Sequence, residues 1–235
     1  MILLTKWILA HLIGDFFMQP RKWIEQKEKK TWKAPYLYLH LAVHLVLLII
    51  LTGDPGLWYA VAIIVVSHWI IDGLKLQLQH ENTRGLWFFI DQILHLLVIV
   101  ITWAWIVQPD INIHSAWPLE YWLILTAALF LTYPTSYFIQ HLMLRWSGDI
   151  KEAQSESLHD AGKFIGILER LFIFISVLAG YWQTVGFLLA AKSVFRFGDL
   201  TRAKDRKLTE YILIGTLISF GIALAIAMWI TIIQG

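Results

Sequence analysis

The chain has 235 residues, of which 58% are hydrophobic and 15% are charged, with a mean hydropathy of +0.62 and a formal net charge of +2. In soluble domains about a quarter of all residues are charged. This composition therefore excludes an ordinary soluble domain and favours an all-α polytopic membrane protein. The small net charge gives no indication of nucleic-acid binding. The absence of cysteine excludes disulfides and thiolate metal ligands.

Long apolar stretches indicate about eight membrane-spanning helices, because about 20 apolar residues cross a bilayer core. The first stretch lacks the basic start and small-residue cleavage site of a signal peptide, so we expect a retained helix. The first stretch is short and the seventh is only about 14 residues long, so a tilted or re-entrant segment is the alternative for either one. The expected spans are residues 2–18, 36–52, 57–75, 86–107, 119–139, 164–181, 184–197 and 209–233. A polar cytoplasmic loop, 141–163, divides a five-span block, 1–140, from a three-span block, 164–235.

The basic residues indicate how these spans are oriented. Most of the 19 Lys and Arg residues fall in alternate connections, and the opposite connections contain none. Because basic loops stay in the cytoplasm, we expect both termini outside. The basic ranges are 21–33, 75–84, 145–163 and 196–207. We interpret the Lys-rich range 21–33 as a solvated loop that sets the topology.

Four pairs of His or Asp residues lie inside the first four apolar stretches, each with a spacing of four residues. This spacing places both members of a pair on one helix face, one turn apart. The pairs are His11/Asp15, His40/His44, His68/Asp72 and Asp91/His95. Each lies near the predicted cytoplasmic end of its span, at a depth of about 6–13 Å for a rise of 1.5 Å per residue. The sequence therefore predicts one intramembrane layer of eight potential ligands.

The order of the pairs indicates an internal repeat. The first and third spans end with H-x3-D, and the second and fourth begin with H-x3-H and D-x3-H. We therefore expect two parallel-repeat hairpins around the His/Asp site, with a pseudo-twofold axis along the membrane normal. Facing hairpins of this kind form a four-helix bundle, the arrangement that holds paired metals in soluble bundles.

The ligand types indicate the kind of metal. Imidazoles and carboxylates without sulfur suit Zn²⁺, Mn²⁺ or Fe²⁺. Eight ligands are too many for one tetrahedral ion, so we expect two divalent ions and a slightly positive centre that attracts an anion. Asp15, Asp72 and Asp91 are the candidate catalytic residues, in bridging or general-base roles. The alternative is a metal-free polar or proton-relay network in which His and Asp bond to each other.

Four other residues are candidates for substrate binding. Gln19 is expected one turn beyond Asp15 on the same stripe, and Lys75 lies three residues beyond Asp72, so both could orient an anionic substrate. A snorkelling interfacial lysine is the alternative for Lys75. Lys192 and Arg196 share a helix face and could form a basic pocket for a phospholipid headgroup; salt-bridged snorkelling is the alternative.

Several stretches resemble an uncharacterised family of bacterial inner-membrane proteins, domain of unknown function 3307. The matching ranges are 11–15 with Gln19 and Pro20, 40–44, 68–72 with Lys75 and 91–95, together with 186–197 and 210–217, which resemble the longer members. The resemblance implies the bacterial inner membrane but no activity. A looser similarity, at the level of motifs, is to membrane-bound metal-dependent hydrolases, and it serves only as an analogy.

These observations favour a binuclear metal-dependent hydrolase that acts on a lipid or polyprenyl phosphate at the cytoplasmic leaflet. A divalent-metal or proton transporter is disfavoured by the few polar groups in the outer halves of the first four spans. A di-iron redox protein, bis-imidazole haem and a structural metal site remain as alternatives. The expected partners are membrane lipids and the anionic substrate, without nucleic acid, and a homo-oligomer is left open.

Overall fold

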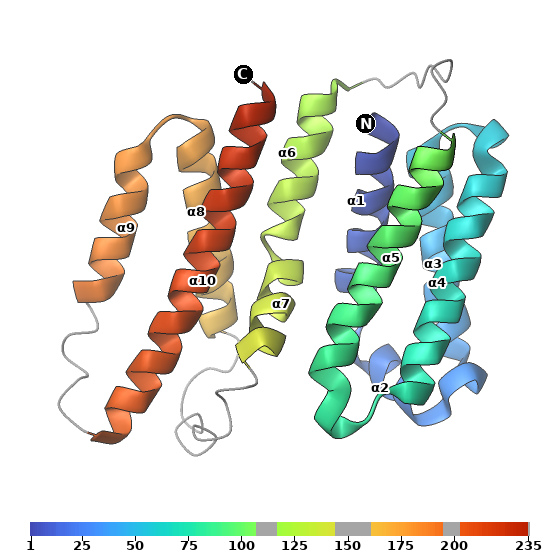
Figure 1. Ribbon diagram of the computed structural model, residues 1–235, viewed down its shortest axis with the longest axis horizontal. Helices are drawn as coiled ribbons and strands as arrows, with labels where there is room; N and C mark the ends of the chain where they lie inside the picture. The colour runs from blue at the N-terminus through green and yellow to red at the C-terminus, as the bar shows by residue number, and fades with distance from the viewer. Residues whose placement is uncertain (107–116, 144–160, 195–202, 235) are drawn as a thin grey trace. The chain divides into compact units, whose positions relative to one another are not determined.

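The computed structural model is all-helical in the parts of the chain that it describes, which are residues 1–106, 117–143, 161–194 and 203–234 (Figure 1). The chain divides into two compact units, Met1–Thr126 and Ala127–Gly235. The greater part of the expected loop 141–163 lies outside the described residues, as does Arg196. The division into blocks 1–140 and 164–235 therefore stays a prediction.

Unit 1 is a closed bundle of four long helices with a short helix across one end (Figure 1). Neighbours in the bundle contact each other in the order α1–α3–α4–α5, and α5 returns to α1. The long helices are α1 (Ile2–Phe16), α3 (Pro35–Thr52), α4 (Trp58–Leu78) and α5 (Arg84–Ile106), and the short one is α2 (Arg21–Lys30). Single 3₁₀ turns, η1 (Thr31–Lys33), η2 (Pro55–Leu57) and η3 (Glu81–Thr83), complete the connections.

Local sequence explains where these helices start and stop. α3 begins with Pro35, whose fixed φ suits the first turn and whose missing N–H needs no partner there. It ends at Gly53, which adopts a left-handed φ of 68° that glycine accepts without strain. The Asp54 side chain then accepts a hydrogen bond of 2.8 Å from the Gly56 amide, which closes a tight turn into α4. α3 and α4 are thereby made antiparallel neighbours.

The packing of unit 1 suits a lipid environment. Away from the His/Asp layer, the bundle interior is mainly apolar and includes Leu3, Trp7, Leu48, Ile64 and Ile99. The outer faces are also apolar and exposed, as shown by Ile49, Ile50, Ile93, Leu97 and Ile101. An exposed apolar surface of this extent marks contact with a membrane or a partner rather than water.

Four described helical segments are long and apolar enough to cross a membrane: Pro35–Thr52, Pro55–Leu78, Glu81–Ile106 and Glu210–Ile233. The number rises to six if two bent helix pairs each count as one span. These pairs are Ile2–Phe16 with Arg21–Lys33, bent by 82°, and Leu119–Phe130 with Tyr133–Met143, bent by 41°. Helices occupy all eight predicted ranges, but the count of eight spans stays a prediction, since α8 carries three charged residues and α9 has only 13 residues.

Unit 2 is built around α8, which contacts α7, α9 and α10. Its helices are α7 (Tyr133–Met143), α8 (Ala161–Leu178), α9 (Trp182–Val194) and α10 (Ala203–Gln234), and α6 (Leu119–Phe130) spans the boundary between the units. A buried arginine, Arg170 of α8, donates to the Leu131 and Thr132 carbonyl oxygens at 2.5 and 3.1 Å. These carbonyls lie at the break between α6 and α7, so Arg170 supplies donors that the interrupted helix lacks.

Candidate metal centre

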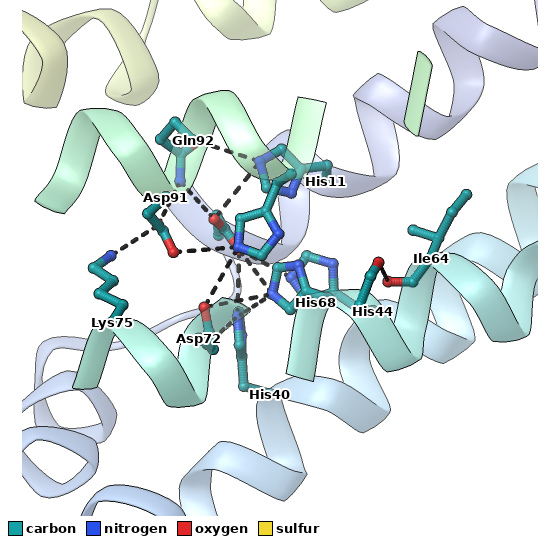
Figure 2. Close-up of polar contacts among 12 residues, drawn as sticks. His11, His40, His44, Ile64, His68, Asp72, Lys75, Asp91 and Gln92 are labelled. Carbon is teal, nitrogen blue, oxygen red and sulfur yellow. Dashed lines mark hydrogen bonds and ion pairs between the residues drawn. The ribbon is translucent and has the colours of Figure 1, made fainter. Parts of the chain in front are cut away.

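All four predicted His/Asp pairs meet inside unit 1, at the level where α1, α3, α4 and α5 converge (Figure 2). Each helix contributes one pair, and the spacing of four residues directs both members to the bundle interior. Seven of the eight side chains belong to buried residues, and the eighth, Asp15, has a side chain that is 10% exposed. The eight side chains are therefore gathered in one cluster, and their role as metal ligands stays a prediction.

Asp15 lies at the centre of the cluster. Its Oδ1 atom is 3.0 Å from His44 Nε2, 3.3 Å from His40 Nε2 and 3.6 Å from His68 Nε2. Its Oδ2 atom lies 3.7 Å from His11 Nε2. The imidazoles also face one another, since His68 Nε2 and His40 Nε2 are 3.2 Å apart. One carboxylate thus contacts imidazoles from three helices, as a shared metal ligand would.

Three groups within the cluster have the donor atoms for a metal ion. The groups are His11, Asp15, His44 and His68; His40, His68 and Asp72; and Asp15, Asp91 and His95. In each group the donor atoms lie within 4.8 Å of one another. His68 and Asp15 each belong to two groups, so the groups are adjacent rather than separate sites. This arrangement fits a binuclear centre with a bridging carboxylate.

Several buried donor atoms in the cluster form no hydrogen bond to the described residues. They are His95 Nε2, Asp91 Oδ1 and His40 Nδ1. His95 Nε2 is 3.3 Å from Asp91 Oδ1 and 3.5 Å from Asp72 Oδ1, but neither contact has hydrogen-bond geometry. Buried polar atoms are nearly always satisfied by a partner, so these atoms fit the requirements of an ion better than those of a closed hydrogen-bond network.

Two lysines contact the cluster on the side that faces away from the apolar interior of the bundle. Lys27 Nζ lies 2.8 Å from Asp72 Oδ2, and Lys75 Nζ lies 2.8 Å from Asp91 Oδ2. The Lys27 side chain is 7% exposed and that of Lys75 is 24% exposed. In Figure 2, Lys75 lies at the opposite end of the cluster from Ile64, which belongs to the apolar interior. Lys75 is the more exposed of the two lysines and therefore marks the side of the site that is nearer to solvent.

The expectation that residues 21–33 form a solvated loop was wrong for Lys27. This range folds as α2 and η1, and Lys27 is buried against Asp72. The available signal was the spacing of Trp23, Ile24 and Lys27, which lie on one face of a short helix. That face packs toward α3, where the Trp23 ring stacks on Tyr36 with a centroid separation of 5.6 Å.

Gln92 is a second site residue that sequence reasoning missed. Its amide nitrogen donates to Asp15 Oδ2 at 2.9 Å and to Asp91 Oδ2 at 3.2 Å. Its amide oxygen lies 3.2 Å from His11 Nε2. Gln92 therefore links ligands from α1 and α5, as an orienting partner of metal ligands does. Its only signal in the sequence was an amide directly after Asp91 in an apolar helix.

The other candidate substrate residues lie elsewhere. Gln19 does not extend the stripe of His11 and Asp15, because α1 ends at Phe16 and Gln19 lies in the break before α2. Lys192 of α9, in unit 2, pairs with Glu169 at 2.5 Å, as the salt-bridge alternative requires. Its expected neighbour Arg196 is outside the described residues. Of the four, only Lys75 contacts the His/Asp cluster in the described structure.

The bundle is closed on the apolar side of the cluster. A small cavity, with room for about one water molecule, lies against His11, His44, His68 and His95. Its other walls are mainly apolar and come from Trp7, Leu48, Ile64 and Ile99, with Ser67 beside them. Farther from the site, the Trp7 indole donates to Thr52 Oγ1 at 2.8 Å and ties α1 to α3. The site therefore has a mainly apolar inner wall with space for about one water molecule.

Comparison with known proteins places the cluster within a family. The chain matches the family described as Protein of unknown function (DUF3307) over residues 3–124, a range that includes all four His/Asp pairs and both lysines. No curated protein and no solved structure gives a significant match. The match covers more than half of the 235 residues, and the chain belongs to the DUF3307 family.

Proposed function

We propose that this protein is an integral membrane metal-binding protein in which the His/Asp cluster holds two divalent ions, Zn, Mn or Fe. We further propose a hydrolytic role on a lipid or polyprenyl phosphate at the cytoplasmic leaflet of the bacterial inner membrane. The observation that carries the proposal is the convergence of eight His and Asp side chains from four helices, with Asp15 and His68 shared between candidate ligand groups.

Burial supports a metal centre over a purely structural polar network. Ionisable side chains inside a membrane cost several kcal/mol each unless they are paired, and they usually mark functional sites. Here the mutual contacts leave His95 Nε2 and Asp91 Oδ1 without hydrogen bonds among the described residues. A network that served only to hold helices together would gain nothing from these unbonded atoms, whereas a metal ion would use both.

The charges of the site support an anionic substrate. Three aspartates and the two lysines leave one net negative charge when the imidazoles are neutral. Two divalent ions would change this to three positive charges, so the loaded centre would need an anion nearby. A phosphate ester meets this need, and Lys75, which is partly exposed, lies where it could receive one.

When bound, divalent ions would supply Lewis acidity for attack of water at phosphorus. Side chains of the protein would hold the reacting groups in place and neutralise charge. Asp15 would be shared by two of the three ligand groups, Gln92 would hold Asp15 and Asp91 in place, and Lys75 would neutralise charge on the phosphate. The apolar wall formed by Trp7, Ile64 and Ile99 would hinder water on its own side, so water would enter the site from the opposite side.

The eight-span topology, with both termini outside and two repeat hairpins, belongs to the same proposal. What supports the hairpins is the contact of α1 with α3 and of α4 with α5. What supports the orientation is the basic helix α2 at the end of the bundle nearest to the lysines, where Arg21, Lys22, Lys29 and Lys30 are exposed. The site would then open toward the cytoplasm.

The closed apolar half of unit 1 makes the transporter alternative weaker. A conduction path needs polar groups on both sides of the site, but beyond the cluster the buried residues are mainly apolar, such as Leu3, Ala10 and Ile106. Among the described residues, the buried polar ones there are few: Thr5, Lys6, Thr52 and Thr102. A di-iron redox centre would use the same ligands, so the identity of the bound metal distinguishes it from a hydrolase.

The proposal is tested by elemental analysis of the detergent-purified protein beside a His44→Ala/His95→Ala variant. We expect about two Zn, Mn or Fe ions per chain in the unmodified protein and a loss in the variant. His80→Ala provides a matched control, because His80 is exposed at η3 and outside the cluster. Absence of metal from all three proteins after each ion is supplied would exclude the metal centre and favour a proton-handling His/Asp network.

A further inference from the structure

The cluster has two chemically different halves. Around Asp15, the contacts come from imidazoles and from the Gln92 amide. Around Asp72 and Asp91, each carboxylate also has a lysine ammonium at 2.8 Å. The first half therefore offers an ion neutral donors and a carboxylate without a lysine, whereas the second already holds two positive charges.

These ammonium groups compete with a second metal ion. A carboxylate oxygen at 2.8 Å from an ammonium directs its lone pairs to that charge, and a divalent ion that used the same carboxylate would be repelled by it at short range. The second half nevertheless contains the unbonded donors His95 Nε2 and Asp91 Oδ1. It is thus a built ligand set in which the nearby ammonium groups oppose a second ion as long as the lysines stay paired with Asp72 and Asp91.

If Lys27 were displaced from Asp72, its own helix, α2, would offer no unpaired carboxylate. Both acidic residues of α2 already have basic partners, since Glu25 pairs with Arg21 and Glu28 pairs with Arg84. Lys27 and Lys75 make no other ion pair among the described residues. An ammonium freed at this position is therefore left without an unpaired carboxylate on α2, and an anion from outside the chain can take that place.

We propose that entry of the second divalent ion releases Lys27 and Lys75 from Asp72 and Asp91, and that the freed ammonium groups bind a phosphate group. Metal and phosphate then bind cooperatively, and the lysines weaken binding at the second metal position until a phosphate is present. This inference rests on the proposed metal centre and assigns Lys27, on α2, as a phosphate-binding residue alongside Lys75.

The position of the lysines fits a phosphate that arrives from the headgroup region. Lys27 comes from α2, which lies across one end of the bundle, and Lys75 lies near the C-terminal end of α4 (Figure 1). The Lys75 side chain is one-quarter exposed. Inorganic phosphate and the headgroup of a phospholipid share this chemistry, so the experiment includes both.

The test measures Mn²⁺ binding to the detergent-purified full chain, with and without inorganic phosphate, and again with a short-chain phosphatidic acid. We expect one tight ion without phosphate and a second ion whose affinity rises about tenfold when phosphate is added, within the usual range of coupling between ligands. A larger rise with the phosphatidic acid than with inorganic phosphate would identify a lipid headgroup as the source.

A Lys27→Gln/Lys75→Gln variant should bind the second ion tightly without phosphate and lose the coupling. Lys27→Arg/Lys75→Arg should restore the coupling, because arginine also pairs with carboxylate and phosphate. Lys29→Gln/Lys30→Gln, which removes two exposed lysines from the same helix, is the matched control and should behave as the unmodified chain. Circular dichroism and a single elution peak establish that each variant is folded.

The outcomes separate this inference from the metal centre itself. If no Mn²⁺ binds to the unmodified chain, the metal centre is wrong and the inference falls with it. If two ions bind with equal strength whether or not phosphate is present, the metal centre stands and the lysine exchange is wrong. Coupling that persists in the Lys27→Gln/Lys75→Gln variant would also overturn the exchange, since the anion would then bind elsewhere.

Discussion

Gly14 of α1 lies directly against the imidazole of His44 in α3. A Cβ atom added at Gly14 would lie 2.4 Å from His44 Nε2 and 2.5 Å from its Cε1, far inside contact distance. Since His44 Nε2 is also 3.0 Å from Asp15 Oδ1, the lack of a side chain at Gly14 allows a histidine of one helix to reach the carboxylate of another. This close approach sets the geometry of the Asp15 half of the cluster.

Gly14→Ala should therefore displace His44 and weaken metal binding at the Asp15 half. We expect a loss of affinity of about 10- to 100-fold, the range typical of disturbed metal-ligand orientation. Equilibrium dialysis with Zn²⁺ measures this effect. Gly221→Ala is the matched control, because a Cβ there would meet nothing within 4 Å. Equal metal affinity in the two variants would show that His44 is not a ligand.

Asp72→Ala should abolish turnover of the lipid phosphate while the protein stays inserted in the membrane. Asp72 contacts three of the imidazoles and Lys27, so its removal takes away a ligand and leaves the Lys27 ammonium without its carboxylate. We expect a fall in kcat/KM of roughly 100-fold or more. Phosphate release in detergent measures it, and resistance to carbonate extraction reports insertion. Full activity would place the reaction elsewhere.

Metal binding should weaken as the pH falls from neutral to about 5. Imidazole binds a metal only in its neutral form, so protons and metal compete for the five histidines of the cluster. At an ion concentration near 100 times Kd, bound metal adds about 2.7 kcal/mol of stability, which raises the thermal midpoint. We expect this rise near pH 7.5 and its loss near pH 5. Thermal melts recorded at each pH, with and without a chelator, measure it. A rise that is independent of pH would contradict imidazole ligation.

Arg170→Met should destabilise unit 2 without changing the metal content of unit 1. Arg170 donates to two carbonyls at the break between α6 and α7, to Ser136 Oγ at 2.6 Å and to Ser219 Oγ at 3.0 Å. Its loss leaves several buried groups without donors, and we expect a cost of about 4 kcal/mol, at about 1 kcal/mol for each of the four hydrogen bonds lost. Limited proteolysis and elemental analysis measure the two effects. A loss of metal would contradict the confinement of the ligands to unit 1.

The membrane-type helices and the four ligand pairs could be predicted from the sequence because both depend on local rules. Apolar length indicates a helix that can cross a bilayer, and a spacing of four places His11 with Asp15, or His68 with Asp72, on one face whatever surrounds the helix. The same rules failed for Gln19, because the helix that would have carried it ends three residues earlier, at Phe16.

Tertiary structure alone decided which side chains from different helices meet. Asp15 became the centre of the imidazoles, Gln92 joined α1 to α5, and Lys27 reached Asp72 across 45 residues of chain. None of these contacts follows from a periodicity, because they depend on the rotation and closeness of packed helices and on the folding of α2 back over the bundle. The sequence by itself determined the four His/Asp pairs and their helix faces. The packing decided that, among the described residues, Asp72 and Asp91 each pair with a lysine, while Asp15 contacts imidazoles and an amide.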